Sequence, residues 1–198
     1  MDEKISRRER KKIQSKQAIL RASVHLFSTK GFQDTSIADI MNEADLGIGT
    51  FYNYFESKEE VLKSLLNGLV EEMRSALKIF VQEKRTPAEI LEKTVMLSAR
   101  LLSENRFVLP LFLSASNLSG LPAGAKELPE EPSGFKLLFD RILTEGQESG
   151  DFRRDIPAEV VTELFHSMFQ AASFSSLPMS FEENIHWKLQ LVLDGLRA

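Results

Sequence analysis

The sequence of 198 residues contains no cysteine. A chain without cysteine forms no disulfide bond, no thiolate zinc site and no catalytic thiol. It also lacks an apolar run approaching the roughly 20 residues that a membrane span needs, and no apolar signal-peptide segment follows its basic N-terminus. These absences predict a cytoplasmic protein without a membrane partner.

Sequence motifs of common enzyme classes are lacking as well. The chain has no G-x-S-x-G nucleophile motif, no H-E-x-x-H zinc motif and no glycine loop for phosphates. We therefore expect neither an enzyme nor a resident cofactor.

Acidic residues outnumber basic ones overall, but positive charge is concentrated at the N-terminus. The net charge is -4, yet the first 30 residues hold nine Lys or Arg against three acids. This local charge of +6 leaves -10 on the rest of the chain. A solvated, flexible N-terminus would show the same run, but the asymmetry also fits a basic DNA-binding arm on an acidic body.

The sequence shows no convincing strand, and its apolar residues recur at helical spacing. We predict an all-α fold with a loose arm over residues 1–10 and helices at about 11–29, 58–82, 86–103, 134–149, 158–175 and 182–197. The buried stripe predicted for the first long helix is Ile13, Leu20, Val24 and Phe27. Residues 1–56 are expected to form a DNA-binding domain and residues 57–198 a larger helical domain.

The 24 residues from Thr35 to Lys58 carry the strongest local signal. Ser36 and Asp39 form a capping-box pattern that begins a short helix. A turn at residues 44–46 follows, then a second short helix at 47–53. A segment this short is unstable in isolation, since isolated helices below about 12 residues are marginal, so neighbouring elements must hold it. The pattern predicts a helix-turn-helix that enters the DNA major groove.

Several side chains of this stretch have chemistry suited to DNA. The hydroxyls of Tyr52 and Tyr54 can donate to phosphates, and Lys58 lies in a first helical turn, where a bound anion would explain a cation. Ile48 suits a thymine methyl group, and Asn53 suits an adenine edge. A solvated helix surface with core tyrosines is the alternative interpretation.

The chain resembles the TetR family of bacterial one-component regulators. The resemblance rests on I-A-D-I-M-N-E-A, on G-T-F-Y-N-Y-F-E-S-K-E-E-V-L after it, and on an N-terminal helix ending A-S-V-H-L-F-S-T-K-G-F. The later G-D-F-R-R-D-I-P is similar to the turn before the penultimate helix of many members.

The resemblance implies a three-helix DNA-binding head and a helical ligand-binding and dimerisation body. It also implies a homodimer joined mainly through the last two helices. Such a dimer would be a repressor that binds a palindromic double-stranded operator and is released by a small-molecule effector.

The resemblance further assigns roles within the head. Base-edge contacts fall on Ile48, Gly49, Thr50 and Asn53. Phosphate contacts fall on Thr35, Ser36, Tyr52, Tyr54 and Lys58. Phe51 and Phe55 match the buried side of the recognition helix.

Two positions depart from the family pattern. Asp45 stands where the family usually has glycine in the turn, although Asp tolerates a left-handed backbone better than most residues. Gly47 stands where a serine usually caps the recognition helix, a change worth only a few tenths of a kcal/mol. Both alter the polar groups near DNA without threatening the fold.

Ten of the 14 phenylalanines lie after residue 79. Most are expected in the core, but a cavity among these helices would suit an apolar or aromatic effector, with a basic residue or His nearby for a negative group. The candidate lining residues are Arg100, Leu101, Phe107, Leu111, Phe112, Phe139, Phe165, His166 and Phe169.

A metal-binding bundle is the alternative for the body. Glu163-x-x-His166 and Glu183-x-x-His186 each place a carboxylate and an imidazole on one helical face, as in di-iron proteins. That chemistry also needs a lone glutamate on each of two other helices. The corresponding inward positions are Leu and Phe, so we expect no metal.

Overall fold

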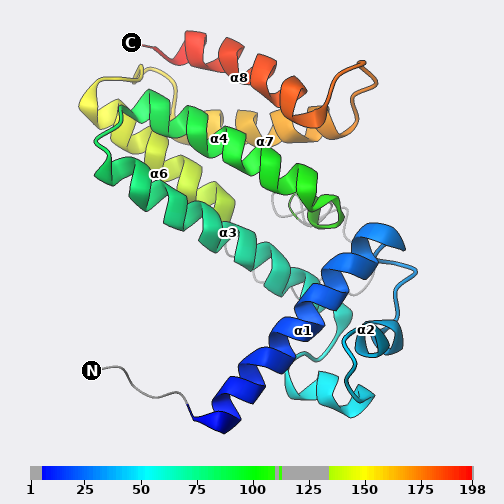
Figure 1. Ribbon diagram of the computed structural model, residues 1–198. Helices are drawn as coiled ribbons and strands as arrows, with labels where there is room; N and C mark the ends of the chain where they lie inside the picture. Colours follow the sequence, from blue (N-terminus) through cyan, green and yellow to red (C-terminus); the bar gives the residue numbers. More distant parts are fainter. Residues whose placement is uncertain (1–5, 110–111, 113–133, 198) are drawn as a thin grey trace. The chain divides into compact units, whose positions relative to one another are not determined.

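A computed structural model describes residues 6–109, 112 and 134–197 (Figure 1). Every regular element in these residues is a helix, which confirms the all-α prediction. None of these helices combines the length and apolar character that crossing a lipid bilayer requires. In chain order they are α1 (Arg7–Thr29), α2 (Ile37–Glu43), the 3-10 helix η1 (Ile48–Asn53), α3 (Lys58–Gln82), α4 (Pro87–Glu104), the 3-10 helix η2 (Arg106–Val108), α6 (Gly134–Ser149), α7 (Ala158–Ser173) and α8 (Phe181–Leu196).

The described residues form two compact units. The first, called the head here, runs up to Leu65 and includes Asn105–Val108. The second, called the body, contains Leu66–Glu104 and the described residues from Leu109 onward. Helix α3 therefore contributes its first two turns to the head and the rest of its length to the body.

Helix α1 begins inside the segment predicted to be a loose arm. The Glu9 amide donates to Ser6 Oγ at 3.1 Å, and the Ser6 amide donates to Glu9 Oε2 at 2.9 Å. This capping box satisfies two amides that a first turn leaves open, so the loose-arm prediction is wrong from Ser6 onward. Ile13, predicted to be buried, is 47% exposed because the head core starts only at Ile19.

The head core joins the apolar faces of α1, α2, η1 and the start of α3. Its buried members are Ile19, Ala22, Phe27, Ile40, Met41, Phe51, Phe55 and Val61. Gly31 follows α1 at a φ of +89°, a conformation that glycine adopts without strain. The turn lets Phe32 pack edge-on against Phe27, with ring centroids 5.1 Å apart.

In the body, α4 packs against both α6 and α8, and α7 packs against the same two helices. Helix α4 also contacts α3, where Ser98 Oγ lies 3.4 Å from Met73 Sδ. The core between these helices is apolar. Its most deeply buried members include Leu91, Leu102, Phe135, Leu143, Phe165, Phe169, Ile185 and Leu189.

The G-D-F-R-R-D-I-P segment ties the end of α6 to the end of α8. Arg154 donates to the Gln147 and Glu148 carbonyls at 2.5 and 2.8 Å, which satisfies carbonyl groups that the last turn of α6 leaves open. The Arg153 amide donates to the Leu196 carbonyl at 2.9 Å. Phe152, which precedes these two arginines, is only 1% exposed and packs in the body core.

The contact between Phe152 and α6 depends on Gly146. A Cβ atom at Gly146 would lie 2.2 Å from Phe152 Cδ2 and 3.1 Å from Pro87 Cβ. We predict that Gly146→Ala destabilises the protein by about 1–3 kcal/mol through overpacking, measured by urea denaturation followed by circular dichroism.

Gly68→Ala is the matched control for this substitution. Gly68 lies within α3, and a Cβ atom there would meet nothing within 4 Å. Alanine should therefore stabilise by about 0.5–1 kcal/mol through helix propensity alone. Equal effects of the two substitutions would contradict the packing argument.

Candidate nucleic-acid interface

The turn between α2 and η1 covers residues 44–47. Asp45 adopts a φ of +53°, so the expectation that it is compatible with a left-handed backbone is confirmed. The amides of Asp45 and Leu46 donate to the Asn42 and Met41 carbonyls at 3.1 and 3.0 Å. These bonds close the C-terminus of α2 and redirect the chain into η1.

The short helix η1 is anchored to the head by Phe51 within it and by Phe55 just after it. Its N-cap, Gly47, offers no side-chain hydrogen bond. Phe51 and Phe55 are 0% and 3% exposed, which confirms the predicted buried side. By contrast Ile48 and Tyr52 are 55% and 62% exposed, although both are large and partly apolar. Such exposure indicates a surface that binds a partner.

The other predicted DNA-binding residues of η1 and its C-cap, Tyr54, divide into two groups. Gly49 and Asn53 are exposed, as are Ile48 and Tyr52. Thr50 and Tyr54 are half-buried, and Tyr54 packs against the head core. The structure therefore places four of the six at the open surface of the helix.

Thr35 and Ser36 lie just before α2 and differ in access. Thr35 is 1% exposed, and its hydroxyl donates to the Gly31 carbonyl at 2.7 Å. The Thr35 side chain is thus used inside the loop between α1 and α2 rather than presented to a phosphate. Ser36 is exposed and caps α2 by accepting from the Asp39 amide at 3.1 Å.

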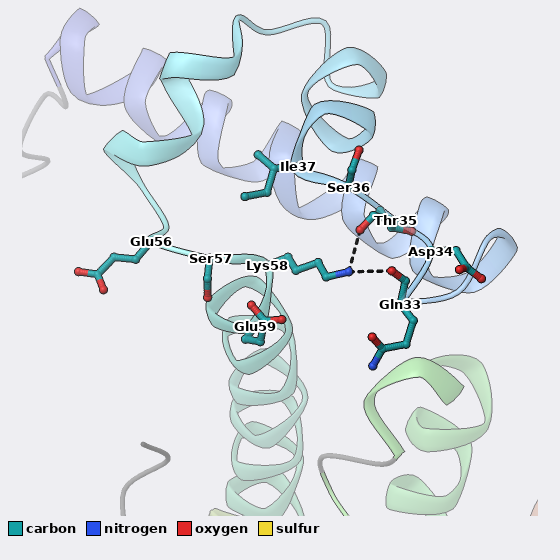
Figure 2. A pocket seen from close by; sticks show the side chains of 9 residues that line it. All are labelled: Gln33, Asp34, Thr35, Ser36, Ile37, Glu56, Ser57, Lys58 and Glu59. Atoms are coloured by element: carbon teal, nitrogen blue, oxygen red, sulfur yellow. Dashed lines mark hydrogen bonds between the residues drawn. The ribbon is translucent and has the colours of Figure 1, made fainter. Parts of the chain in front are cut away.

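Lys58, at the start of α3, reaches across to the same loop (Figure 2). Its ammonium donates to the carbonyls of Phe32, Gln33 and Thr35 at 2.7, 3.0 and 2.9 Å. An ammonium has three N–H donors. This arrangement uses all of them and leaves none for the phosphate contact expected from the sequence. No sequence signal reveals this arrangement, because the partners are backbone carbonyls 23 to 26 positions away.

A charged network joins the end of α1 to the start of α2. Lys30 Nζ lies 2.7 Å from Asp39 Oδ2, and the Ser36 amide and hydroxyl both donate to that oxygen at 2.8 Å. The hydrogen bond from Lys30, followed by those from Ser36, holds the Asp39 pKa well below its ordinary value of 3.8. The predicted capping box of α2 is therefore confirmed and includes an additional cation.

The first turns of α1 are strongly basic. The exposed cations there are Arg7, Arg8, Arg10, Lys11, Lys12 and Lys16. Cations at a helix N-terminus oppose the helix dipole, so this cluster is locally unfavourable without an anionic partner. Since DNA phosphates are such a partner, the charge pattern favours nucleic acid.

In the body, several predicted lining residues form an aromatic cluster. The Phe112 ring lies 5.5 Å from His166 and 5.4 Å from Phe169, measured between centroids. Phe139 and Phe165 stack at 5.5 Å. These rings are almost fully buried, and His166 is half-buried.

The remaining predicted lining residues are on α4, in the head or outside the described residues. Leu101 is buried and Arg100 is exposed on α4. Phe107 belongs to the head, where its ring centroid is 5.6 Å from that of Phe27. Leu111 lies outside the described residues.

The structure gives the metal alternative no support. The described residues contain no group of three or more His, Asp or Glu side chains close enough to hold a metal ion. The Glu183 carboxylate accepts from the Ser180 amide at 3.3 Å in the capping box of α8. Glu163 is exposed on α7, and His166 faces the Phe112 ring.

Residues 19–65 match the family model described as bacterial regulatory proteins, tetR family. Among curated proteins, the fatty acid metabolism regulator protein of Bacillus subtilis is 26% identical over 149 residues, covering 74% of this chain and 75% of that protein. The transcriptional repressor KstR2 of Mycobacterium tuberculosis is 25% identical over 144 residues, covering 72% of each.

A solved structure shares the fold over most of the chain. Thermus thermophilus FadR, a TetR-family transcriptional repressor in complex with lauroyl-CoA, superposes with a TM-score of 0.66 at 26% identity. The match covers 91% of this chain and 94% of that one. The similarity therefore extends through both the head and the body.

Asp39→Asn should lower stability near neutral pH, and the loss should shrink as the pH falls. Because the folded-state pKa of Asp39 is depressed, its contribution is complete above the ordinary value of 3.8 and disappears as the pH falls through the folded-state pKa. Urea denaturation of both proteins at about pH 7 and about pH 3 measures this difference.

Asp34→Asn serves as the control, because the Asp34 carboxylate makes no hydrogen bond within the described part of the chain. It should change stability little at either pH. A wild-type advantage over Asp39→Asn that is the same at both pH values would show that the network contributes nothing through the Asp39 charge.

Proposed function

This chain is a member of the TetR family of bacterial transcriptional regulators, and on that premise we propose that it is a homodimeric repressor of palindromic operators released by a fatty acyl-CoA. It is a ligand-responsive DNA-binding protein. We place it in the cytoplasm, where its operator DNA lies, and assign it no enzymatic reaction, since its relatives are regulators.

The observation that carries the DNA assignment is the exposure of Ile48 and Tyr52 on a helix fixed by Phe51 and Phe55. Ile48 is suited to a thymine methyl group, and the Asn53 amide to an adenine edge. Thr50, which is half-buried, completes the base-reading set together with Gly49.

Phosphate contacts come from the margins of this surface. The Tyr52 and Tyr54 hydroxyls donate hydrogen bonds, and the basic turns of α1 add charge. The Ser36 amide and hydroxyl both donate to Asp39 within the head, so a phosphate contact at Ser36 would have to displace one of these bonds. The Thr35 contribution is limited to its backbone, since its hydroxyl is occupied. Contacts to DNA phosphates fix the orientation of the protein on DNA without reading the base sequence.

A second copy of this chain is the proposed partner of α7 and α8. Both helices expose large apolar side chains while their opposite faces are buried. The exposed residues are Val160, Leu164, Trp187 and Leu191. A two-fold dimer would cover them and place two heads in successive major grooves, roughly 34–36 Å apart as in helix-turn-helix dimers generally.

The effector class is proposed from the body and the relatives together. The buried phenylalanines around Phe112 and Phe165 offer an apolar environment for an acyl chain. Two relatives are a fatty acid metabolism regulator and a FadR protein in complex with lauroyl-CoA. An acyl-CoA combines an apolar chain with an anionic head, which agrees with the apolar effector predicted from the sequence.

Release of the operator requires the acyl-CoA to bind one conformation of the dimer better than the other. A ligand shifts an equilibrium only by its difference in affinity for the two states. Helix α3 has residues in both units, so a shift of α3 would change the spacing of the two heads. Operator affinity then falls because both heads no longer fit one palindrome.

Selection of bound duplexes from a random pool should enrich a palindrome. Ile48→Ala should weaken the base preference at one position in each half-site, where a mismatched base pair typically costs about 1–3 kcal/mol. Tyr52→Phe should weaken binding to all sequences alike by removing a phosphate contact. Gel shifts at fixed salt measure both effects, and failure to enrich any palindrome would contradict the regulator assignment.

Lauroyl-CoA should lower the affinity for the selected palindrome by about 5- to 150-fold, the usual range of allosteric coupling. Fluorescence anisotropy of a labelled duplex, titrated with lauroyl-CoA, measures the change. Free coenzyme A and laurate, added separately, are the controls and should release little DNA. Palindrome binding that no acyl-CoA of any chain length affects would contradict the effector class alone.

A further inference from the structure

We propose that Lys58 is a positioning residue for DNA recognition, which fastens the first turn of α3 to the loop between α1 and α2. This inference rests on the proposed function, in that DNA is the ligand whose recognition it serves. In this role Lys58 makes no direct contact with a DNA phosphate. It binds the loop backbone that precedes α2 and so fixes the position of that helix.

All three N–H donors of the Lys58 ammonium are used within the head. The carbonyl oxygens of Phe32, Gln33 and Thr35 all lie at hydrogen-bonding distance from one nitrogen. Figure 2 shows the bonds to Gln33 and Thr35. The same nitrogen lies 4.7 Å from the centroid of the Phe32 ring, a favourable position for a cation. Every proton of Lys58 therefore has an acceptor before DNA arrives.

The carbonyls belong to the segment that sets the position of α2. Thr35 directly precedes Ser36, the N-cap of α2. Inside the loop the Thr35 hydroxyl is held by the Gly31 carbonyl. Lys58 adds three hydrogen bonds from α3 to the carbonyls of the same loop. Together the two contacts link Ser36 and the start of α2 to α3.

The surroundings of Lys58 disfavour a phosphate. Asp34, Glu56 and Glu59 line the same surface depression as Lys58 (Figure 2). Three carboxylates against one ammonium give the depression a negative balance, and like charges repel a phosphate. A direct contact would also require the phosphate to displace carbonyls that already accept from the ammonium.

The experiment compares Lys58→Met and Lys58→Arg with the wild-type full-length protein on two duplexes. One duplex is the palindrome recovered by selection, and the other is its scrambled sequence. Dissociation constants are measured by anisotropy over a salt series. Lys63→Met is the matched control, because Lys63 lies on the same helix and its ammonium makes no hydrogen bond or ion pair with any described residue.

The arginine variant separates the two roles of Lys58. Guanidinium binds phosphate at least as well as ammonium does, but its planar fork does not direct three donors from one point. If Lys58 positions α2, both variants lose about tenfold in affinity for the palindrome, an effect of the size expected for charged hydrogen bonds. The loss for the scrambled duplex is smaller, so the specificity ratio falls. A head that is merely unfolded would weaken both duplexes equally.

Opposite results overturn the proposal. Wild-type affinity in Lys58→Arg, together with a salt slope reduced by about 0.9 per contact in Lys58→Met, would show a direct phosphate contact. Wild-type affinity and specificity in both variants would also overturn it. Lys63→Met should leave the specificity ratio unchanged.

A measurement on the wild-type protein covers the case in which a variant does not fold. Nitrogen-15 spectra of the lysine ammonium groups should show slow proton exchange at Lys58 without DNA, and little change when the palindrome is added. Exchange as fast as that of Lys63, or slow exchange that appears only with DNA, overturns the proposal. Failure of the wild type to bind any palindrome would instead contradict the proposed function, and this spectrum would still report on the carbonyl contacts.

Discussion

Burial of Phe51 is the constraint on which the recognition surface depends. The helix η1 has only six residues and no side-chain cap, and a helix of that length has too few internal hydrogen bonds to persist alone. Its conformation is therefore a product of tertiary packing. Phe51 and Phe55 are buried in the head core and fix the helix from one side. The opposite side is left to Ile48 and Tyr52, whose exposure has a stability cost that DNA binding would offset.

Charge adds a second condition to this packing. The basic start of α1 is stabilised by Ser6 and Glu9, so its cations stand on a formed helix rather than on a flexible arm. A preformed cluster loses less conformational entropy when it binds phosphates. The residues after position 30 carry a net charge of -10, so the attraction to DNA is concentrated on α1.

Much of this could be predicted from the sequence because the determinants are local. The capping pairs at Ser36 and Asp39, the helical spacing of Phe51 and Phe55, and the turn at Asp45 are all read over a few residues. The role of Lys58 could not be predicted, since its partners are backbone carbonyls, which have no residue signature. Phe107 was expected in the body by its position after α4, yet it packs on Phe27. The loose-arm prediction failed because the run of cations was interpreted as a flexible segment, although Ser6 and Glu9 have the spacing of a capping box.

These two distant contacts meet at one place in the head. Lys58, from α3, lies over the Phe32 ring, and Phe107, from η2, lies against Phe27. Phe27 and Phe32 pack against each other edge-on. Both connections along the chain between head and body, α3 and the Asn105–Val108 segment, thus contact the same pair of rings at the end of α1. Because packed aromatic contacts adjust poorly to small displacements, a shift delivered through either connection would reach the loop before α2. The effector signal and the placement of Ser36 would then depend on the same few contacts.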